Sequence, residues 1–228
     1  MKIRQLFDHD TWTYTYLLFD EKTKEAAIID SVKEKFDRDS KYIEELGLTL
    51  KYAFETHVHA DHVTASGLLR KKTACKIGVH VDSGNECADL KLHDGDEFGL
   101  GNQTISVIHT PGHTNGDVSY KIDGAVFTGD ALLIRACGRT DFQQGSSITL
   151  YHSITQKLFT LDDDTVVYPG HDYDGFTSST IGEEKAQNPR LANEKAQADF
   201  IEIMDNMDLP KPKRIDVAVS GNLVCGMN

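Results

Sequence analysis

The chain has 228 residues, of which 39% are hydrophobic, so it is long enough for one large domain or two small ones with an ordinary core. Its 24 Lys and Arg residues are outnumbered by 36 Asp and Glu residues, which gives a formal net charge of -12. A field of that sign repels phosphate backbones and anionic lipids, and no apolar run is long enough to span a bilayer, so neither nucleic acid nor a membrane is expected as a partner.

The first part of the chain begins with strands. Aromatic and β-branched residues predict strands at Tyr14–Phe19 and Glu25–Ile29. A helical spacing of apolar residues predicts a helix over Ser31–Leu46, which Gly47 ends. Another short strand, Lys51–Glu55, leads directly into a histidine-rich segment.

The rest of the chain mixes helices and strands. Strands are expected at Ile77–Val79, Thr104–His109, Val118–Ile122, Ala125–Thr128 and around Val166 and Val167. Helices are expected from about Asp61 through Leu68–Cys75, over Leu150–Leu158 and around Phe200–Met204, with turns at His93–Gly101 and an extended tail at Leu209–Arg214. The pattern predicts an α+β fold with two mixed sheets packed between helices, and residues 1–228 are expected to form a single domain.

The cysteines indicate a reducing compartment. Cys75, Cys87, Cys137 and Cys225 lie far apart and form no CxxC pair, which argues against a disulfide framework and a four-cysteine zinc site. The first ten residues, MKIRQLFDHD, have no apolar stretch of the signal-peptide kind. Together these features favour a cytoplasmic protein.

The segment THVHADH carries the strongest chemical signal. After a predicted strand it places four metal-ligating side chains within six positions, namely His57, His59, Asp61 and His62. Imidazole and carboxylate groups suit zinc, iron and manganese. Three histidines and an aspartate at this spacing therefore indicate a metal site.

Three later positions share the same context. His113 lies in TPGHTNGD, Asp130 in FTGDAL and His171 in YPGHDY, and each follows a predicted strand at a turn that contains glycine. Loops of this kind gather at one edge of a sheet, where functional sites are commonly built. These three residues are therefore expected to join the histidine-rich segment.

The set of ligands leaves two arrangements open. Divided between two metals with Asp130 as a bridge, the seven side chains form a hydrolytic dinuclear site. Alternatively, His57, His113 and Asp130 form a facial triad on one metal, which leaves positions for O2 and substrate as in non-haem Fe(II) oxygenases.

The four motifs THVHADH, TPGHTNGD, FTGDALL and YPGHDY together resemble the metallo-β-lactamase superfamily over nearly the whole chain. The resemblance implies an αβ/βα sandwich with the metal at one edge of the two sheets. The segments GDALLIRACGRTDFQQG, YPGHDYDGFT, NPRL and LPKP resemble persulfide dioxygenases of the ethylmalonic-encephalopathy protein type more closely than glyoxalase II. Glyoxalase II carries a helical C-terminal domain, whereas only 57 residues follow His171 here.

This resemblance implies a reaction and a set of roles. Persulfide dioxygenases oxidise glutathione persulfide with O2 and water to sulfite and glutathione, using one Fe(2+) per chain. Matched residue by residue, the iron ligands are His57, His113 and Asp130, and the side chains expected to surround them are His59, Asp61, His62 and His171. The alternative is a dinuclear zinc hydroxyacylglutathione hydrolase of the glyoxalase II kind, and a third hypothesis is a metal-stabilised module that binds a partner.

Three further residues are candidates for contact with the substrate or the reacting atoms. Arg139 suits a carboxylate of glutathione, although a structural pairing with Asp141 is the competing interpretation. Tyr173 is expected to offer its phenol to the persulfide or to oxygen, as a catalytic and substrate-binding residue, unless it is simply an aromatic packing residue. Asp172 is expected to act in catalysis by orienting a group beside the metal.

Two macromolecular partners are also expected. No rhodanese domain is fused to this sequence, so a separate rhodanese-type sulfurtransferase is expected to supply the persulfide. Members of the family often self-associate, which implies a homodimer.

Overall fold

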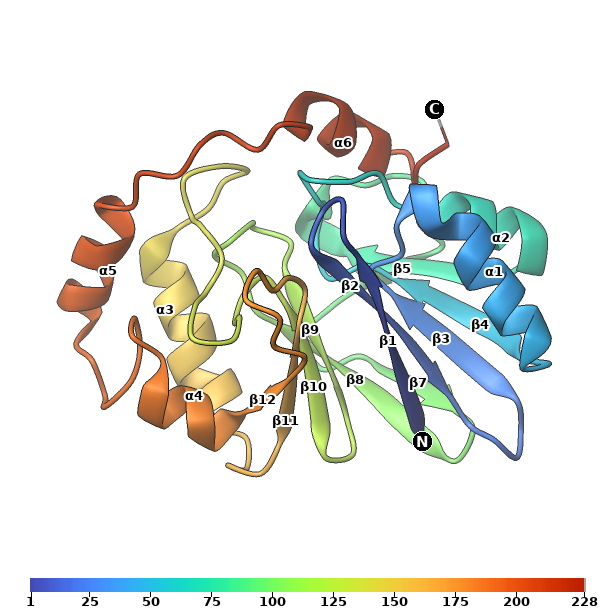
Figure 1. The fold of residues 1–228 in the computed structure, drawn as a ribbon, viewed down its shortest axis with the longest axis horizontal. Coiled ribbons are helices and arrows are strands. Elements are labelled where there is room, and N and C mark those ends of the chain that lie inside the picture. The colour runs from blue at the N-terminus through green and yellow to red at the C-terminus, as the bar shows by residue number, and fades with distance from the viewer. Residues whose placement is uncertain (228) are drawn as a thin grey trace.

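The computed structural model describes residues 1–227, in which two six-stranded sheets lie between helices (Figure 1). The first sheet has its strands in sequence order, and the second sheet has the order β12-β11-β10-β9-β8-β7. The strands of the first sheet are β1 (Lys2–Asp8), β2 (Thr13–Phe19), β3 (Glu25–Ile29), β4 (Thr49–Phe54), β5 (Lys76–His80) and β6 (Leu90–Leu92). Those of the second are β7 (Glu97–Leu100), β8 (Gln103–His109), β9 (Val118–Ile122), β10 (Ala125–Gly129), β11 (Val166–Pro169) and β12 (Ser179–Thr180).

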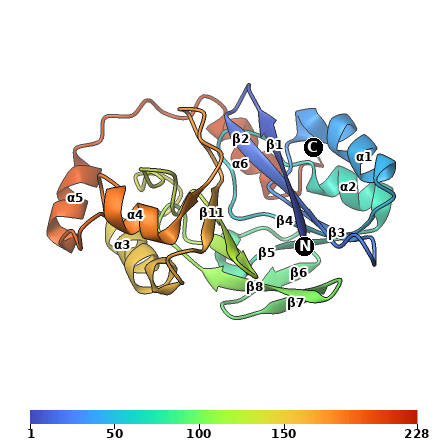
Figure 2. The ribbon, with the colours of Figure 1, turned by 60° about the horizontal axis from the view of Figure 1, so that its bottom comes forward.

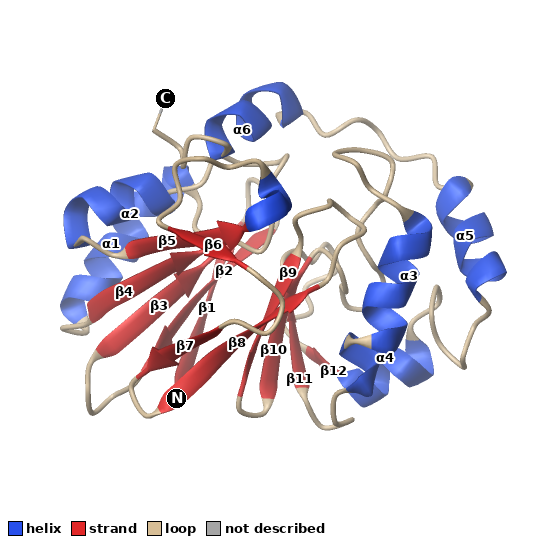
Figure 3. Cartoon of the chain, turned by 180° about the vertical axis from the view of Figure 1, so that it is seen from behind, coloured by secondary structure: helices blue, strands red, loops and turns tan. Residues whose placement is uncertain are grey.

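Helices cover the outer face of each sheet, as Figures 2 and 3 show from two further directions. The first sheet is covered by α1 (Phe36–Glu45) and α2 (Ser66–Thr73), and the second by α3 (Ser147–Gln156), α4 (Ile181–Gln187) and α5 (Gln197–Asp205). From α5 the chain crosses one end of the molecule to α6 (Ile215–Asn222), on the side of α1 and α2 (Figure 1). Within residues 1–227, no helix has the length and apolar character needed to cross a membrane.

The core is double because each sheet buries both of its faces. In β2, Tyr14, Tyr16 and Leu18 pack between the two sheets, whereas Leu17 and Phe19 pack on the side of α1 and α2. Successive side chains of a strand point to opposite faces, so a strand that is apolar at every position must be covered on both. The predicted α+β sandwich of two mixed sheets between helices is confirmed.

Strand direction brings the predicted site loops to one edge. β10 is parallel to β11 and antiparallel to β9, which is antiparallel to β8, so β8, β10 and β11 run the same way. Backbone hydrogen bonds join this edge to the first sheet, from Val118 N to Thr56 O (2.8 Å) and from Tyr14 N to Gly170 O (2.8 Å). The loops that follow β4, β8, β10 and β11 therefore meet at the junction of the two sheets.

Most predicted elements are present with shifted ends. The strands predicted at Glu25–Ile29 and Val118–Ile122 coincide with β3 and β9. The helix expected from about Asp61 begins only at Ser66, because the preceding residues form the site loop. Strand β7 lies inside the segment predicted as turns, where its four residues carry too weak an alternation to identify.

The C-terminal part differs from the extended tail predicted from the sequence. Residues 209–214 have no regular structure, but the chain then forms α6, in which Ala218, Gly221 and Asn222 are buried. Glycine and asparagine are weak helix formers, so the sequence of α6 carries little helical signal of its own.

The cysteine prediction was wrong for one pair. Cys87 and Cys225 form a disulfide across 138 positions of sequence, with their Cα atoms 6.1 Å apart, a separation usual for this bond. Cys75 and Cys137 are buried free thiols. The pairing arises because the C-terminal segment returns to the loop after β5, a contact that spacing in the sequence does not reveal.

Replacing Phe54 with Ala should cost about 3–5 kcal/mol of unfolding free energy, because a fully buried ring would leave a cavity between the sheets. Phe54 is 0% exposed and stacks on Tyr52 and Tyr120 at ring-centroid distances of 5.1 and 4.9 Å. Urea unfolding followed by circular dichroism measures the change. Ile148→Ala, at a residue that is 53% exposed, should stay within about 0.5 kcal/mol of the parent, and equal losses in the two variants would contradict this description of the core.

Candidate metal centre

Three of the predicted ligands converge at the junction of the sheets. His57 follows β4, His113 follows β8 and Asp130 follows β10. One potential ligand atom from each lies within 4.8 Å of those of the other two. Two imidazoles and one carboxylate at this separation can bind one face of a metal ion.

A hydroxyl between Asp30 and His57 orients the first imidazole. Thr56 Oγ1 donates to Asp30 Oδ2 (2.8 Å), so its lone pairs face His57 Nδ1 at 2.9 Å and accept the proton of that nitrogen. His57 Nε2 is then the nitrogen without a proton, the form that binds a metal. Burial also lowers the pKa of His57 well below its usual value, which keeps the ring neutral.

The second imidazole is held by the main chain. His113 Nδ1 lies 2.6 Å from the carbonyl oxygen of Arg139, which accepts its proton. His113 Nε2 thereby faces Asp130, with 3.7 Å between Nε2 and Oδ2. Both imidazoles thus present the same nitrogen to the space beside Asp130.

Asp30 and Thr56 were not identified from the sequence. Asp30 has a left-handed backbone conformation (φ +54°), and its Oδ1 accepts from Thr56 N at 2.7 Å. Gly129 has φ +51°, and a Cβ there would lie 2.5 Å from Thr56 Oγ1, so only glycine fits beside this hydroxyl. Asp30 follows the predicted strand Glu25–Ile29 directly, the same strand-end context that identified the ligands, and could have been found by that signal.

His171 links two carboxylates. Its Nδ1 lies 2.7 Å from Asp130 Oδ1, and its Nε2 lies 3.1 Å from Asp61 Oδ2. Burial lowers the pKa of His171, but the two carboxylates outweigh it and hold the pKa well above its usual value. For Asp130, burial raises the pKa, but the surrounding imidazoles, His171 foremost, lower the pKa by more. A charged His171 would fix Asp130 through one oxygen and leave the other toward the metal position.

The remaining residues of THVHADH form a second group of donors. Ligand atoms of His59, Asp61 and His62 also lie within 4.8 Å of one another. His62 Nδ1 is 2.8 Å from Asp61 Oδ2, and His59 Nε2 is 3.1 Å from Asp30 Oδ1. His59 Nδ1 and His62 Nε2 are buried without a hydrogen-bond partner in the structure. This group lies next to His57, whose ring centroid is 4.1 Å from that of His59, and it retains two ring nitrogens able to bind a ligand.

The guanidinium of Arg139 is occupied by protein groups. It forms a bidentate ion pair with Asp141 (both distances 2.7 Å) and donates to the carbonyl oxygens of Pro210 (2.7 Å) and Leu209 (3.2 Å). Four of its five donor positions are thereby used. Arg139 thus makes the structural pairing with Asp141 that was the competing interpretation. Its contact with a substrate carboxylate stays a prediction.

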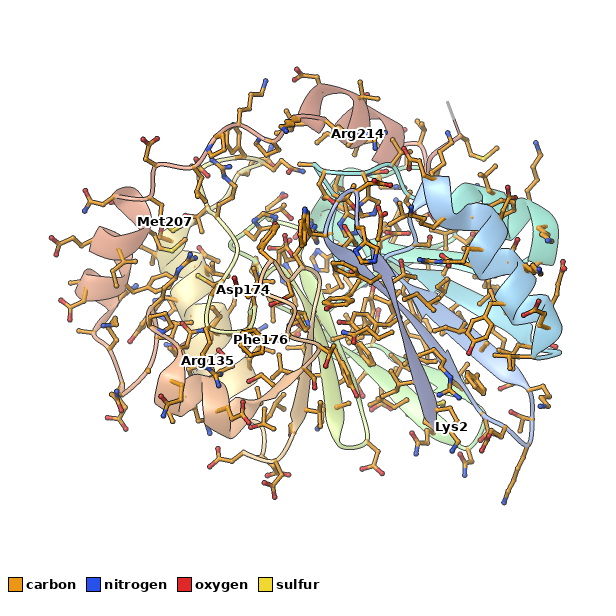
Figure 4. All side chains as sticks on the ribbon, viewed as in Figure 1. Lys2, Arg135, Asp174, Phe176, Met207 and Arg214 are labelled. Carbon is orange, nitrogen blue, oxygen red and sulfur yellow. A yellow bond between two sulfur atoms is a disulfide. The ribbon has the colours of Figure 1, made fainter. Side chains whose placement is uncertain are left out.

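Asp172 and Tyr173 have different surroundings. Asp172 is buried, and its Oδ2 accepts from the backbone N–H groups of Asp174, Gly175 and Phe176 at 2.5–3.0 Å. Asp172 thus holds the loop in which Figure 4 labels Asp174 and Phe176. Its role in orienting a group at the metal stays a prediction. Tyr173 is 63% exposed, and its ring is parallel to that of His171 at a centroid distance of 6.1 Å.

A separate cluster outside the four motifs is poorly shaped for a metal. Ligand atoms of His80, Asp82 and His109 lie within 4.8 Å of one another. However, the two imidazole rings are stacked with centroids 3.8 Å apart and planes 15° apart. The lone pair of an imidazole nitrogen lies in the plane of its ring, so nearly parallel stacked rings cannot point at one ion.

Replacing Thr56 with Val should weaken metal binding roughly 10–100-fold, because the isosteric side chain cannot accept the proton of His57 Nδ1. Titration of the protein with Fe(II) against a competing chelator under argon measures the affinity. Thr104→Val, at an exposed position of β8, should bind as the parent does. Parent-like affinity in Thr56→Val would show that the hydroxyl does not orient His57.

The free energy of unfolding should depend on pH through His80. Burial, assisted by the neighbouring His109, lowers the pKa of His80 to about 4, whereas the unfolded chain takes up this proton near pH 6.5. The stabilising contribution is therefore complete above pH 6.5 and is lost as the pH falls toward 4, because the unfolded state binds the proton first. His80→Asn, which keeps an acceptor for Asp82 N, should flatten this part of the profile in urea unfolding. A parent His80 that titrates near 6.5 by NMR would contradict the expectation.

Comparisons with known proteins agree with the geometry. The profile of the Metallo-beta-lactamase superfamily matches residues 13–171. The human protein named "Persulfide dioxygenase ETHE1, mitochondrial" is 49% identical over 228 residues, which cover 99% of this chain and 89% of the human protein. The crystal structure of ETHE1 from Myxococcus xanthus has a TM-score of 0.96 and 52% identity, covering 99% of this chain and 100% of that one.

A more distant structure shares the fold. A metallo-beta-lactamase from Staphylococcus aureus has a TM-score of 0.89 at 26% identity and covers 100% of this chain and 73% of its own. The similarity to the ETHE1 proteins is much higher and extends along the whole chain. This chain therefore belongs to the metallo-beta-lactamase superfamily and, within it, to the family of persulfide dioxygenases.

Proposed function

We propose that this enzyme oxidises glutathione persulfide with O2 and water to sulfite and glutathione, using one Fe(2+) ion per chain. The main support is the near-full-length similarity to proteins named persulfide dioxygenase. The donor set agrees with it, because His57, His113 and Asp130 are two imidazoles and one carboxylate on one side of a shared space, a set typical of non-haem Fe(II) enzymes.

The residues present fit an iron ion. The Nδ1 atoms of His57 and His113 are occupied by Thr56 Oγ1 and the Arg139 carbonyl oxygen, so their Nε2 atoms would hold the metal together with Asp130. When bound, Fe(II) supplies the electron that spin-restricted O2 needs in order to react, which Zn(II) cannot do.

The protein contributes position and charge. His171, fixed between Asp61 and Asp130, keeps the carboxylate ligand in place through one oxygen. In this proposal the exposed phenol of Tyr173, beside His171, contacts the persulfide at the rim of the site. The Asp172 carboxylate supports this contact by holding the loop that carries Tyr173.

The setting of the reaction is part of the same proposal. We place the enzyme in the cytoplasm, where low-molecular-weight thiols are maintained in the reduced state; the name of the human relative places that protein in the mitochondrion. A separate rhodanese-type sulfurtransferase would supply the persulfide, and the enzyme would act as a homodimer.

One observation favours a second candidate, a dinuclear zinc hydroxyacylglutathione hydrolase. His59 Nδ1 and His62 Nε2 are buried without partners, as expected of ligands to a second ion. Against this, both ring nitrogens of His171 already bind carboxylates, and a second metal would have to displace one of those contacts.

Metal content and O2 uptake distinguish the two candidates. Anaerobically purified protein should carry about one iron per chain and should consume O2 when glutathione persulfide is added. Asp130→Ala should lose both the iron and the uptake, because a carboxylate ligand is removed, whereas Asp123→Ala, at an exposed turn, should retain them. The proposal fails if the protein holds about two zinc ions and hydrolyses S-lactoylglutathione with no persulfide-dependent uptake.

A further inference from the structure

The C-terminal segment, residues 215–227, is fastened to the metal-motif loop, residues 57–64. The side chain of Asn222 is buried, and its Nδ2 donates to the carbonyl oxygens of His59 (2.9 Å) and His62 (2.8 Å). Its Oδ1 accepts from Thr64 N at 2.7 Å. One amide thus holds three main-chain groups of the loop that carries the histidines.

Carbonyl oxygens of the segment also bind residues that flank the loop. Cys225 O accepts from Gly67 N at 3.0 Å, and Gly226 O accepts from Lys33 Nζ at 2.7 Å. Gly226 has φ +72°, and a Cβ there would lie 2.0 Å from Thr64 O. The segment therefore approaches the loop more closely than a residue with a side chain could at this point.

A covalent bond secures the same segment. The Cys87–Cys225 disulfide joins it to the loop after β5. Asn85 belongs to the same loop as Cys87. Its Nδ2 donates to Asn222 O (2.7 Å) and lies 3.7 Å from Cys225 Sγ, while its Oδ1 accepts from Cys87 N (3.0 Å). The disulfide, Asn85 and Asn222 form a continuous connection from the surface to the metal-motif loop.

The two sulfur positions differ in accessibility. Cys225 is 1% exposed, whereas Cys87 is only partly buried. Cys87 is therefore the residue of the pair that we expect an external thiolate to attack, with the buried Cys225 as the leaving group. The Asn85 amide beside Cys225 Sγ provides a donor to the departing thiolate.

We propose that the Cys87–Cys225 disulfide is a thiol-exchange site through which low-molecular-weight thiols loosen the metal-motif loop. A thiolate attacks Cys87 Sγ and forms a mixed disulfide, while the electron pair of the broken S–S bond leaves with Cys225 Sγ, which takes up a proton. A second thiolate attacks the external sulfur, which releases Cys87 as a thiolate and yields the disulfide of the two external thiols. Two thiols are thereby oxidised as the protein disulfide gains two electrons.

The proposed thiol exchange is separate from persulfide oxidation and acts only through the attachment of the C-terminal segment to the metal-motif loop. Reduction removes the covalent closure of a loop of 138 positions and leaves Asn222 and the main-chain contacts to hold the segment. Disulfides inside cells are often redox-sensing. The loop can therefore become more mobile without any change in the ligands themselves.

The first experiment locates the thiols. Protein exposed to glutathione disulfide is unfolded in denaturant that contains iodoacetamide and no reductant. The alkylated cysteines are then mapped by mass spectrometry. Alkylation confined to Cys75 and Cys137 is expected, and reduced glutathione should make Cys87 and Cys225 reactive. Alkylation of all four cysteines after the oxidising treatment would overturn the proposal.

The second experiment follows the loop by hydrogen exchange over 57–67 and 215–227 in defined glutathione buffers. Reduction should speed exchange in both segments by more than about tenfold and lower the Tm by roughly 5–15 °C. Cys87→Ser should reproduce the reduced state and ignore glutathione, whereas Val217→Ser, on the exposed side of α6, should respond as the parent does. Exchange over 57–67 that is equally slow in the oxidised, reduced and Cys87→Ser proteins would refute the coupling.

Asn222→Asp separates the attachment from the disulfide. This variant keeps Cys87 and Cys225 but loses both donations from Nδ2, so exchange over 57–67 should be fast even in the oxidised protein. Asn206→Asp, at an exposed position, is the matched control and should exchange as the parent does. Slow exchange in oxidised Asn222→Asp would show that the C-terminal segment does not hold the loop.

Discussion

A buried imidazole binds a metal only through a nitrogen that carries no proton, and the Thr56 hydroxyl determines which nitrogen of His57 that is. The hydroxyl can do so because Asp30 takes its hydrogen. Much of the surrounding backbone serves this contact: Asp30 adopts a left-handed conformation at the end of β3, and Gly129 leaves space where any Cβ would collide with Thr56. The packing of the two sheets thus places the proton of His57 on Nδ1 and leaves Nε2 free to bind a metal.

The charges of the site compensate one another locally. Asp30, Asp61 and Asp130 are carboxylates at a largely buried junction, and each lies within hydrogen-bonding distance of an imidazole. Unpaired buried charges are costly, so such carboxylates persist only when they are paired and hydrogen-bonded. The histidines of THVHADH therefore have two uses, since they can bind metal and also make its acidic surroundings stable.

The convergence of His57, His113 and Asp130 was predictable because each one stands just after a strand, and strand direction brings such positions together. The two-layer fold was equally visible in the apolar segments. Residues that act through another group were harder to find: Thr56 is ordinary in sequence, and the carbonyl partners of Arg139 at Leu209 and Pro210 lie 70 and 71 positions away. The same holds for Asn222 and for the Cys87–Cys225 pair, whose contacts exist only after the chain has returned across the molecule. A sequence pattern shows which groups can do chemistry, but long-range packing decides which of them are already engaged.

Arg139 connects two distant parts of the molecule within a single residue. Its guanidinium holds the carbonyl oxygens of Leu209 and Pro210, in the stretch that crosses from α5 to α6, where Figure 4 labels Arg214. Its own carbonyl oxygen orients His113. The length of the stretch between α5 and α6 is therefore linked to the position of His113. An insertion or deletion in that stretch would shift Arg139 and, through the Arg139 carbonyl oxygen, the imidazole of His113, which the stretch itself does not contact.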